Sequence, residues 1–96
     1  MAIVFVQDVE GGTQEIYDKI QEKMDAHANP PAGLIIHTAG PTETGWRVVD
    51  VWESEEACNQ FGEVLAPILQ EVGIEEEPEL YQAHAFVSAW RRPSGD

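Results

Sequence analysis

Basic residues are scarce in this sequence. Five lysines and arginines stand against 18 aspartates and glutamates, so the 96 residues carry a formal net charge of −13. A surface of that sign repels the phosphates of nucleic acids and the headgroups of anionic lipids. We therefore expect no nucleic-acid partner and no membrane partner.

Several common kinds of site lack their residues as well. Cys58 is the only cysteine, which excludes an internal disulfide and a thiolate metal cage. The segment EGGTQ (10–14) is too short for a phosphate-binding loop and lacks its lysine. No hydrophobic run approaches the roughly 20 residues of a membrane-spanning helix, and the first residues lack the basic region of a secretory signal. The sequence thus predicts a cytoplasmic protein without metal or cofactor.

Hydrophobic residues, in contrast, are plentiful. They make up 43 % of the chain, which is enough to form the core of a single domain. We expect that domain to span residues 1–90 and residues 91–96 to form a flexible tail. A domain this small buries a modest fraction of its surface, and it therefore gains much by forming a homodimer.

Hydrophobic patterning predicts four strands and two helices. The strands are expected at residues 2–9, 33–40, 46–52 and 80–90, with GPTETG (40–45) as the hairpin loop between the second and the third. The first helix begins after a Thr13 cap and ends before the paired prolines at 30 and 31. The second begins after Ser54 and ends at Gly73, with a kink or a restart at Pro67.

This order predicts an α+β fold of the ferredoxin-like βαββαβ type. With right-handed crossovers, two helices cover one face of a four-stranded antiparallel sheet. The sequence supplies no third layer for the opposite face. We therefore expect a second copy of the chain to cover it, sheet against sheet.

The hairpin between the second and third strands gathers unusual residues on one face. A symmetric loop pairs Ala39 with Trp46 and His37 with Val48, and side chains then alternate between the two faces. One face carries a carboxylate, an imidazole and two indoles: Ile35, His37, Ala39, Trp46, Val48, Asp50 and Trp52. The other is largely aliphatic, as a contact between two sheets requires: Leu34, Ile36, Thr38, Arg47, Val49, Val51 and Glu53.

Aromatic walls with a few convergent polar groups are typical of a small-molecule site. We interpret Trp46 and Trp52 as substrate-binding residues, and His37 and Asp50 as catalytic residues. Each also has a structural interpretation. Trp52 would pack in the core, Trp46 would cap the edge of the sandwich, and His37 would be a hydrogen-bonded structural histidine. Asp50 would form an ion pair or lie exposed on a strand that the helices cover incompletely. The basic residues open to Asp50 for an ion pair are Arg47 and Lys23.

Three further residues are candidates for the same site. His84 lies among small and apolar residues, which favour a neutral imidazole. We interpret it as a further catalytic residue or as a histidine at the dimer contact. Tyr17 and Phe61 can reach the sheet from the two helices, where they would bind substrate or pack in the core.

One segment resembles a known family. VVDVWESEEACNQF (48–61) combines a strand, a tryptophan, a Glu-Ser cap, an acidic first helical turn and a phenylalanine. With the βαββαβ order, it resembles the dimeric α+β barrel superfamily and, within it, the antibiotic-biosynthesis-monooxygenase-like domains and their uncharacterised relatives. The resemblance spans residues 2 to about 90. It implies a homodimer whose two sheets form a barrel, with a pocket between the sheet and the helices of each subunit.

The resemblance implies one of several activities. They are cofactor-independent oxygenation of quinol-like aromatics, polyketide cyclisation, haem degradation and muconolactone-type isomerisation, and some members have no demonstrated activity. Trp52 matches the tryptophan before the second helix, and Asp50 matches the acid two residues earlier. The pocket asparagine of the oxygenases and haem degraders has no counterpart on this sheet.

Three functions stay open on these residues. An enzyme would act on an aromatic or enolisable substrate, with His37 as general base, Asp50 orienting it or the substrate, and His84 or a tryptophan N–H stabilising the anion. That anion would then react with oxygen, cyclise or isomerise. Alternatively, the protein is a non-catalytic ligand-binding or structural dimer, or it binds haem.

Overall fold

The computed structural model describes residues 1–24 and 31–87. They form six elements: β1 (Ile3–Glu10), α1 (Gln14–Met24), β2 (Leu34–Pro41), β3 (Gly45–Trp52), α2 (Glu55–Glu71) and β4 (Glu79–Gln82). The predicted order of strands and helices is confirmed. The predicted tail, 91–96, and the last residues of the predicted fourth strand lie outside the described residues.

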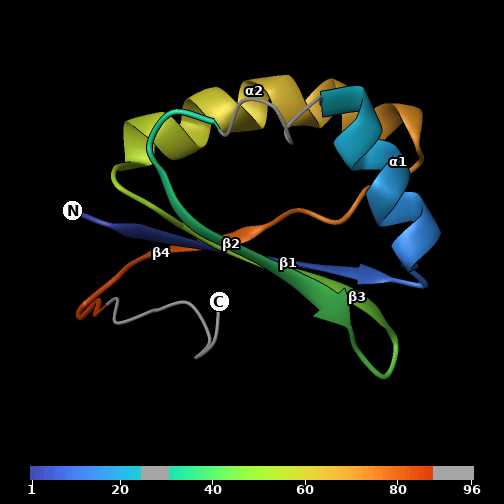
Figure 1. The fold of residues 1–96 in the computed structure, drawn as a ribbon, viewed down its shortest axis with the longest axis horizontal. Helices are drawn as coiled ribbons and strands as arrows, with labels where there is room; N and C mark the ends of the chain where they lie inside the picture. Colours follow the sequence, from blue (N-terminus) through green and yellow to red (C-terminus); the bar gives the residue numbers. More distant parts are fainter. Residues whose placement is uncertain (25–30, 88–96) are drawn as a thin grey trace, which may run out of the picture.

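The strands form one antiparallel sheet in the order β2-β3-β1-β4. Both helices lie on the same side of this sheet (Figure 1). We call that side the covered face, which carries Phe5 and Asp50, and the opposite side the open face, which carries Val4 and Val51. The arrangement is the ferredoxin-like fold that the sequence predicts.

Both helices begin where their capping residues predict. The backbone N–H of Ile16 donates to Thr13 Oγ1 (3.2 Å) at the start of α1. The N–H of Ala57 donates to Ser54 Oγ (3.1 Å) at the start of α2. After α2 the chain turns at Gly73, whose φ of +82° lies in the left-handed region that glycine tolerates.

The predicted restart at Pro67 does not occur. α2 continues through this residue as one helix of 17 residues. A proline removes one backbone donor from a helix, but the helix can persist where side chains on both sides pack against a core. Leu65 is buried before Pro67, and Ile68 packs against the same core after it.

The fourth strand is much shorter than predicted. β4 ends at Gln82, which pairs with Ile3, the first residue of β1. Only Met1 and Ala2 precede Ile3, and the N–H of Ala83 donates to the carbonyl of Ala2 (2.9 Å), so the strand cannot extend as far as the hydrophobic pattern of residues 80–90 suggests. Residues 83–87 follow it without strand structure.

The hairpin register differs from the symmetric one by two residues. His37 lies opposite Asp50, and Pro41 lies opposite Trp46. The loop shrinks accordingly to residues 42–44, and it is closed by the N–H of Gly45 donating to Thr42 Oγ1 (3.0 Å). Since a shift of two preserves the alternation, the predicted division of His37, Asp50 and Trp46 onto one face still holds.

A bulge at the start of β2 corrects the predicted face of two residues. Leu34 lies opposite Trp52 and Ile36 opposite Val51, so Ile35 has no partner across the strand. Leu34 consequently packs against the core instead of joining the open face. Ile35 is 42 % exposed.

The hydrophobic core lies between the covered face and the helices. Trp52 is its largest fully buried side chain. In α2 the buried stripe passes through Leu65, while Val64 is 57 % exposed. The buried members of the core are Ile3, Phe5, Ile20, Trp52, Cys58 and Leu65.

Candidate functional site

A buried acid–base pair joins the two strands of the hairpin. Asp50 is 2 % exposed, and its Oδ1 lies 2.5 Å from Nδ1 of His37, the residue directly opposite on β2. An ionised carboxylate can only accept hydrogen bonds, so Nδ1 of the imidazole donates. This contact fixes the tautomer of a neutral His37 with its second nitrogen, Nε2, free to accept.

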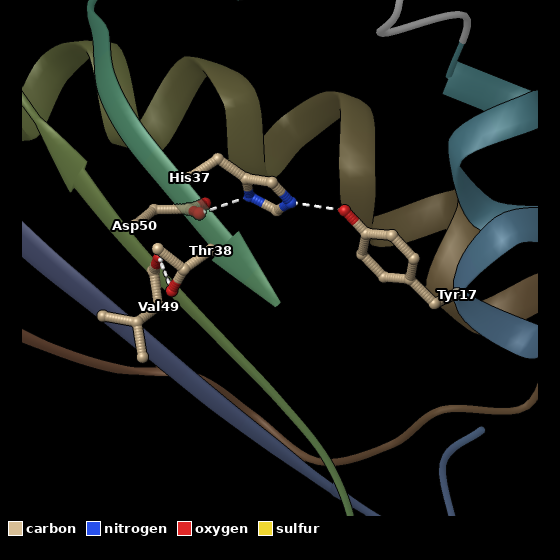
Figure 2. A network of polar contacts seen from close by, with 5 residues as sticks. All are labelled: Tyr17, His37, Thr38, Val49 and Asp50. Carbon is tan, nitrogen blue, oxygen red and sulfur yellow. Dashed lines mark hydrogen bonds and ion pairs between the residues drawn. The ribbon is translucent and has the colours of Figure 1, made fainter. Parts of the chain in front are cut away.

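The hydroxyl of Tyr17 fills that second position. Tyr17 projects from α1 toward β2, and its oxygen lies 2.5 Å from Nε2 of His37 (Figure 2). The two rings are nearly parallel, with an interplanar angle of 13°. Three elements thus supply one continuous chain of hydrogen bonds, in which Tyr17 donates to His37 and His37 donates to Asp50.

Burial and charge keep the Tyr17 hydroxyl protonated. Burial raises the pKa of Tyr17 above its ordinary value of 10.0, and the negative charges of Asp50 and Asp18 raise it further. At neutral pH the phenol therefore retains its proton and remains a hydrogen-bond donor.

A cavity opens beside this chain, between the covered face and the two helices. The space in which the centre of a water molecule fits measures about 60 Å³, and Tyr17, His37 and Asp50 all line it. The remaining walls are mostly apolar: Phe5, Val9, Ile16, Ile20, Met24, Trp46, Val48, Phe61, Leu65, Leu69 and Ile74. Its few other polar side chains are Gln7, Thr13 and Gln21.

A second hollow borders the same three residues. It measures about 340 Å³ and is also lined by Tyr17, His37 and Asp50. Leu34 and Trp52 form part of its wall. The hydrogen-bonded chain therefore borders both spaces, and a small molecule in either one would lie against it.

Both tryptophans predicted at the site are there. The ring of Trp46 lies 5.6 Å from that of Tyr17 and lines the cavity. Trp52 packs against Phe61 with 4.8 Å between ring centroids, so it is a core residue as well as part of the second hollow. Neither buried indole N–H has a hydrogen-bond partner within the described residues. A buried donor without a partner is rare in folded proteins.

The other predicted residues divide into two groups. Phe61 and Tyr17 line the cavity. His84, in contrast, is exposed in the segment after β4 and lines neither hollow beside the three residues, so the fold of one chain does not bring it to His37 and Asp50.

The ion pairs that the sequence left open for Asp50 are not formed. Arg47 binds Asp8 through two hydrogen bonds of 2.6 and 2.9 Å. Lys23 contacts Glu71 at 2.8 Å. Asp50 bonds instead to His37, which the symmetric register had placed opposite another residue.

One polar residue of the cavity, Gln7, was not predicted from the sequence. Gln7 is 4 % exposed, and its side-chain amide donates to the backbone carbonyl of Glu76 (2.8 Å). It follows Ile3 and Phe5 on the covered face at the same alternation, which is the signal that could have identified it. Its hydrogen bond ties the segment before β4 to β1.

The described part of the chain contains neither a metal-binding cluster nor a membrane-spanning helix. Within residues 1–24 and 31–87, no group of three His, Cys, Asp or Glu side chains is arranged to hold a metal ion. No helix among these residues is both long and apolar enough to cross a membrane.

Solved structures with the same fold exist in several organisms. A variant of SnoaB, a cofactor-independent oxygenase from Streptomyces nogalater, superposes with a TM-score of 0.65 at 15 % identity, over 90 % of this chain and 96 % of that one. A candidate antibiotic biosynthesis monooxygenase from Chloroflexus aurantiacus gives 0.63 at 10 % identity, over 92 % and 98 %. A third, from Deinococcus radiodurans, gives 0.59 at 13 %, over 95 % and 100 %.

These similarities establish the fold of the chain. The resemblance to antibiotic-biosynthesis-monooxygenase-like proteins that the sequence suggests is confirmed at the level of structure. No family model matches the sequence, and neither does any curated protein.

Proposed function

We propose that this protein is a small-molecule enzyme that removes a proton from an aromatic or enolisable substrate. The observation that supports the proposal is the buried Asp50–His37 pair, which forms part of the wall of an otherwise apolar cavity. An unpaired carboxylate in such a place costs several kcal/mol by general transfer data. A carboxylate that holds a neutral imidazole beside an empty space is the arrangement of a general base and its orienting acid.

His37 would be the final acceptor of the substrate's proton. A neutral imidazole whose Nδ1 donates to a carboxylate keeps a basic second nitrogen that can bind a proton. The carboxylate of Asp50 would stabilise the imidazolium that forms, at a contact of 2.5 Å. The pair would thus stabilise the imidazolium more than the neutral imidazole, and this difference lowers the barrier to proton transfer.

The rest of the cavity suits a planar, mostly apolar substrate. Trp46 and Phe61 provide aromatic surfaces for stacking. The unpartnered indole N–H of Trp46 would donate to the oxygen on which negative charge develops. The substrate anion would then react with molecular oxygen, attack an internal carbonyl or take the proton back at another carbon. The fold likeness to SnoaB, a cofactor-independent oxygenase, supports the first route.

Deuterium exchange into 2-tetralone tests this proposal with a simple compound in place of the natural substrate. This bicyclic ketone is aromatic and enolisable, and each proton removed from C1 is replaced by deuterium in heavy water. We expect the protein to accelerate the exchange, measured by proton NMR, and His37→Ala to lose about 100-fold or more of it.

The neighbouring residue Thr38 offers a matched control. Its side chain projects to the open face and donates to the carbonyl of Val49 at 3.1 Å (Figure 2). Thr38→Val changes the same strand without touching the cavity, so it should exchange at the wild-type rate. Saturable binding of 2-tetralone without any exchange would instead make the protein a non-catalytic binding module.

We also propose that two copies of the chain pack through their open faces. This face is largely aliphatic, and within the described residues neither helix covers it. It carries Ile36 and Tyr81, which are 42 % and 52 % exposed, beside Val4, Val6, Val49 and Val51. Burying such a patch against an identical one is favourable at roughly 25 cal/mol per Å² of apolar area.

The lone and buried Cys58 suits the cytoplasm, where we place the protein.

Sedimentation equilibrium tests the homodimer. We expect twice the monomer mass of 10.6 kDa for the wild type. Val49→Asp places a charge at the centre of the open face and should return the monomer. Val64→Asp, the same change on the exposed surface of α2, should leave the dimer intact. A wild-type monomer would refute this part of the proposal.

A further inference from the structure

Both nitrogens of the proposed base are already occupied in this structure. Nδ1 of His37 donates to Asp50, and Nε2 accepts the hydroxyl proton of Tyr17, each across 2.5 Å. The imidazole therefore has no lone pair directed at the cavity. A substrate beside these residues would contact the hydroxyl oxygen of Tyr17 before it could reach His37.

The carboxylate is a poor alternative for direct contact. The side chain of Asp50 is 3 % exposed, whereas that of His37 is 32 % exposed. Asp50 lies on β3, directly opposite His37, and its Oδ1 accepts the hydrogen bond from Nδ1. A phenolic oxygen, in contrast, keeps a second lone pair when it donates its proton, so it can accept from a substrate at the same time.

We propose that Tyr17 is a catalytic residue that relays the substrate's proton to His37. The C–H or O–H bond of the substrate breaks, and its electron pair stays on the substrate. The released proton bonds to the oxygen of Tyr17 while the original hydroxyl proton moves to Nε2. Tyr17 ends neutral, His37 ends as an imidazolium paired with Asp50, and no oxidant or reductant is consumed. The inference rests on the proposed role of His37 as the base.

The surroundings of Tyr17 support a relay over a permanent tyrosinate. Desolvation and two nearby carboxylates hold the phenol in its neutral form. A neutral phenol can take up one proton only if it gives up another in the same step, which its short contact with Nε2 permits. Trp46 lies against the ring at 5.6 Å between centroids, and the Thr13 cap fixes the start of α1 one turn earlier, so the hydroxyl is held in position.

The competing role for Tyr17 is that of a displaceable plug. In that case the substrate would push the hydroxyl aside and bind Nε2 of His37 directly. The two roles predict opposite effects of Tyr17→Phe, because this change keeps the ring and removes only the hydroxyl. A relay loses its proton path, whereas a base freed from its plug works as well as before or better.

Deuterium exchange into 2-tetralone distinguishes the roles. For a relay, Tyr17→Phe should lower the exchange rate about 100-fold while its dissociation constant for 2-tetralone, measured by NMR titration, stays within about twofold. The double variant Tyr17→Phe/His37→Ala should be no slower than either single variant, because both residues serve one step. Tyr81→Phe removes a hydroxyl from the exposed tyrosine of β4 and is the matched control.

The outcomes separate the relay from the proposed function. Wild-type or faster exchange in Tyr17→Phe, with slow exchange in His37→Ala, would overturn the relay and keep His37 as the base. Fast exchange in His37→Ala, or no exchange in the wild type, would overturn both.

A second substitution tests the relay without removing the hydroxyl. In the protein with 3-fluorotyrosine at position 17, the phenol ionises at lower pH, and a tyrosinate has no proton to pass on. The alkaline decline of the buffer-corrected exchange rate should move to lower pH. A decline that does not move would contradict the relay, because simple packing of the ring does not depend on its ionisation.

Discussion

The sheet carries two acid–base pairs of the same design on its opposite faces. Asp8 and Arg47 lie directly opposite each other on β1 and β3, and His37 and Asp50 do so on β2 and β3. The first pair is on the open face, with side chains 57 % and 53 % exposed. In the second, the Asp50 side chain is 3 % exposed. The same cross-strand arrangement therefore places one carboxylate in solvent and the other in the protein interior.

Solvent explains the difference in what the pairs can do. Water and salt screen the charges of an exposed pair, so such a pair adds little to stability. A buried carboxylate has lost its water and depends on its one partner. It therefore fixes the orientation of that partner through their hydrogen bond, and of the two pairs only His37–Asp50 adjoins the cavity with Tyr17.

The largest effect is expected for the fully buried tryptophan of β3 on the covered face. Trp52→Ala removes a fully buried indole two residues from Asp50 and should lower the free energy of unfolding by about 3–5 kcal/mol. Val51, the residue before Trp52 on β3, lies on the open face. Val51→Ala should lower the free energy of unfolding by less than half as much. Urea denaturation measures both, and equal losses would mean that the faces do not differ in packing.

The next effect concerns the charge of the buried carboxylate. Asp50→Asn keeps the shape of the side chain but cannot stabilise an imidazolium. The rate of deuterium exchange into 2-tetralone should fall about 100-fold or more, while circular dichroism should show an unchanged fold. Asp8→Asn is the corresponding change in the exposed pair and should leave the exchange rate unaltered. Retained exchange in Asp50→Asn would show that the buried charge is not used.

The ionisation of Tyr17 should appear as an effect of alkaline pH. Its pKa is raised in the folded protein, so the unfolded chain loses this proton first. The stability contribution of the neutral phenol is thus complete below the unfolded value of about 10 and is lost as the pH rises through the folded value. Tyrosinate absorbance of the wild type minus that of Tyr17→Phe should have its midpoint above 10. A midpoint at or below 10 would contradict the burial of this hydroxyl.

The smallest effect is expected for the exposed pair at acidic pH. The hydrogen bonds from Arg47 lower the pKa of Asp8 below its ordinary 3.8. The pair's contribution is therefore present above the unfolded pKa and is lost as the pH falls through the folded one. Asp8→Asn should change the thermal midpoint slightly at neutral pH and not at all once Asp8 is protonated. A large, salt-insensitive change would show that this pair is not a surface pair.

Much of the fold follows from local sequence patterns. Thr13, Ser54 and Gly73 set the ends of the helices through contacts within a few residues. Alternation assigned His37 and Asp50 to one face even though the symmetric loop paired them with other residues, because a shift of two residues preserves the face. The bulge at Ile35 broke this rule, and the face of Leu34 was predicted wrongly.

The sequence by itself determined the order of the elements and the gathering of His37, Asp50, Trp46 and Trp52 on the covered face, because both depend on a period of two or of 3.6 residues. Only the tertiary structure decided which residues touch. The closure of residues 42–44 set His37 against Asp50, and the packing of α1 over the sheet brought Tyr17 to Nε2 from 20 positions away. The end of β1 at Ile3 left His84 beyond the last strand pair. Those contacts depend on distances between elements, which no local pattern specifies.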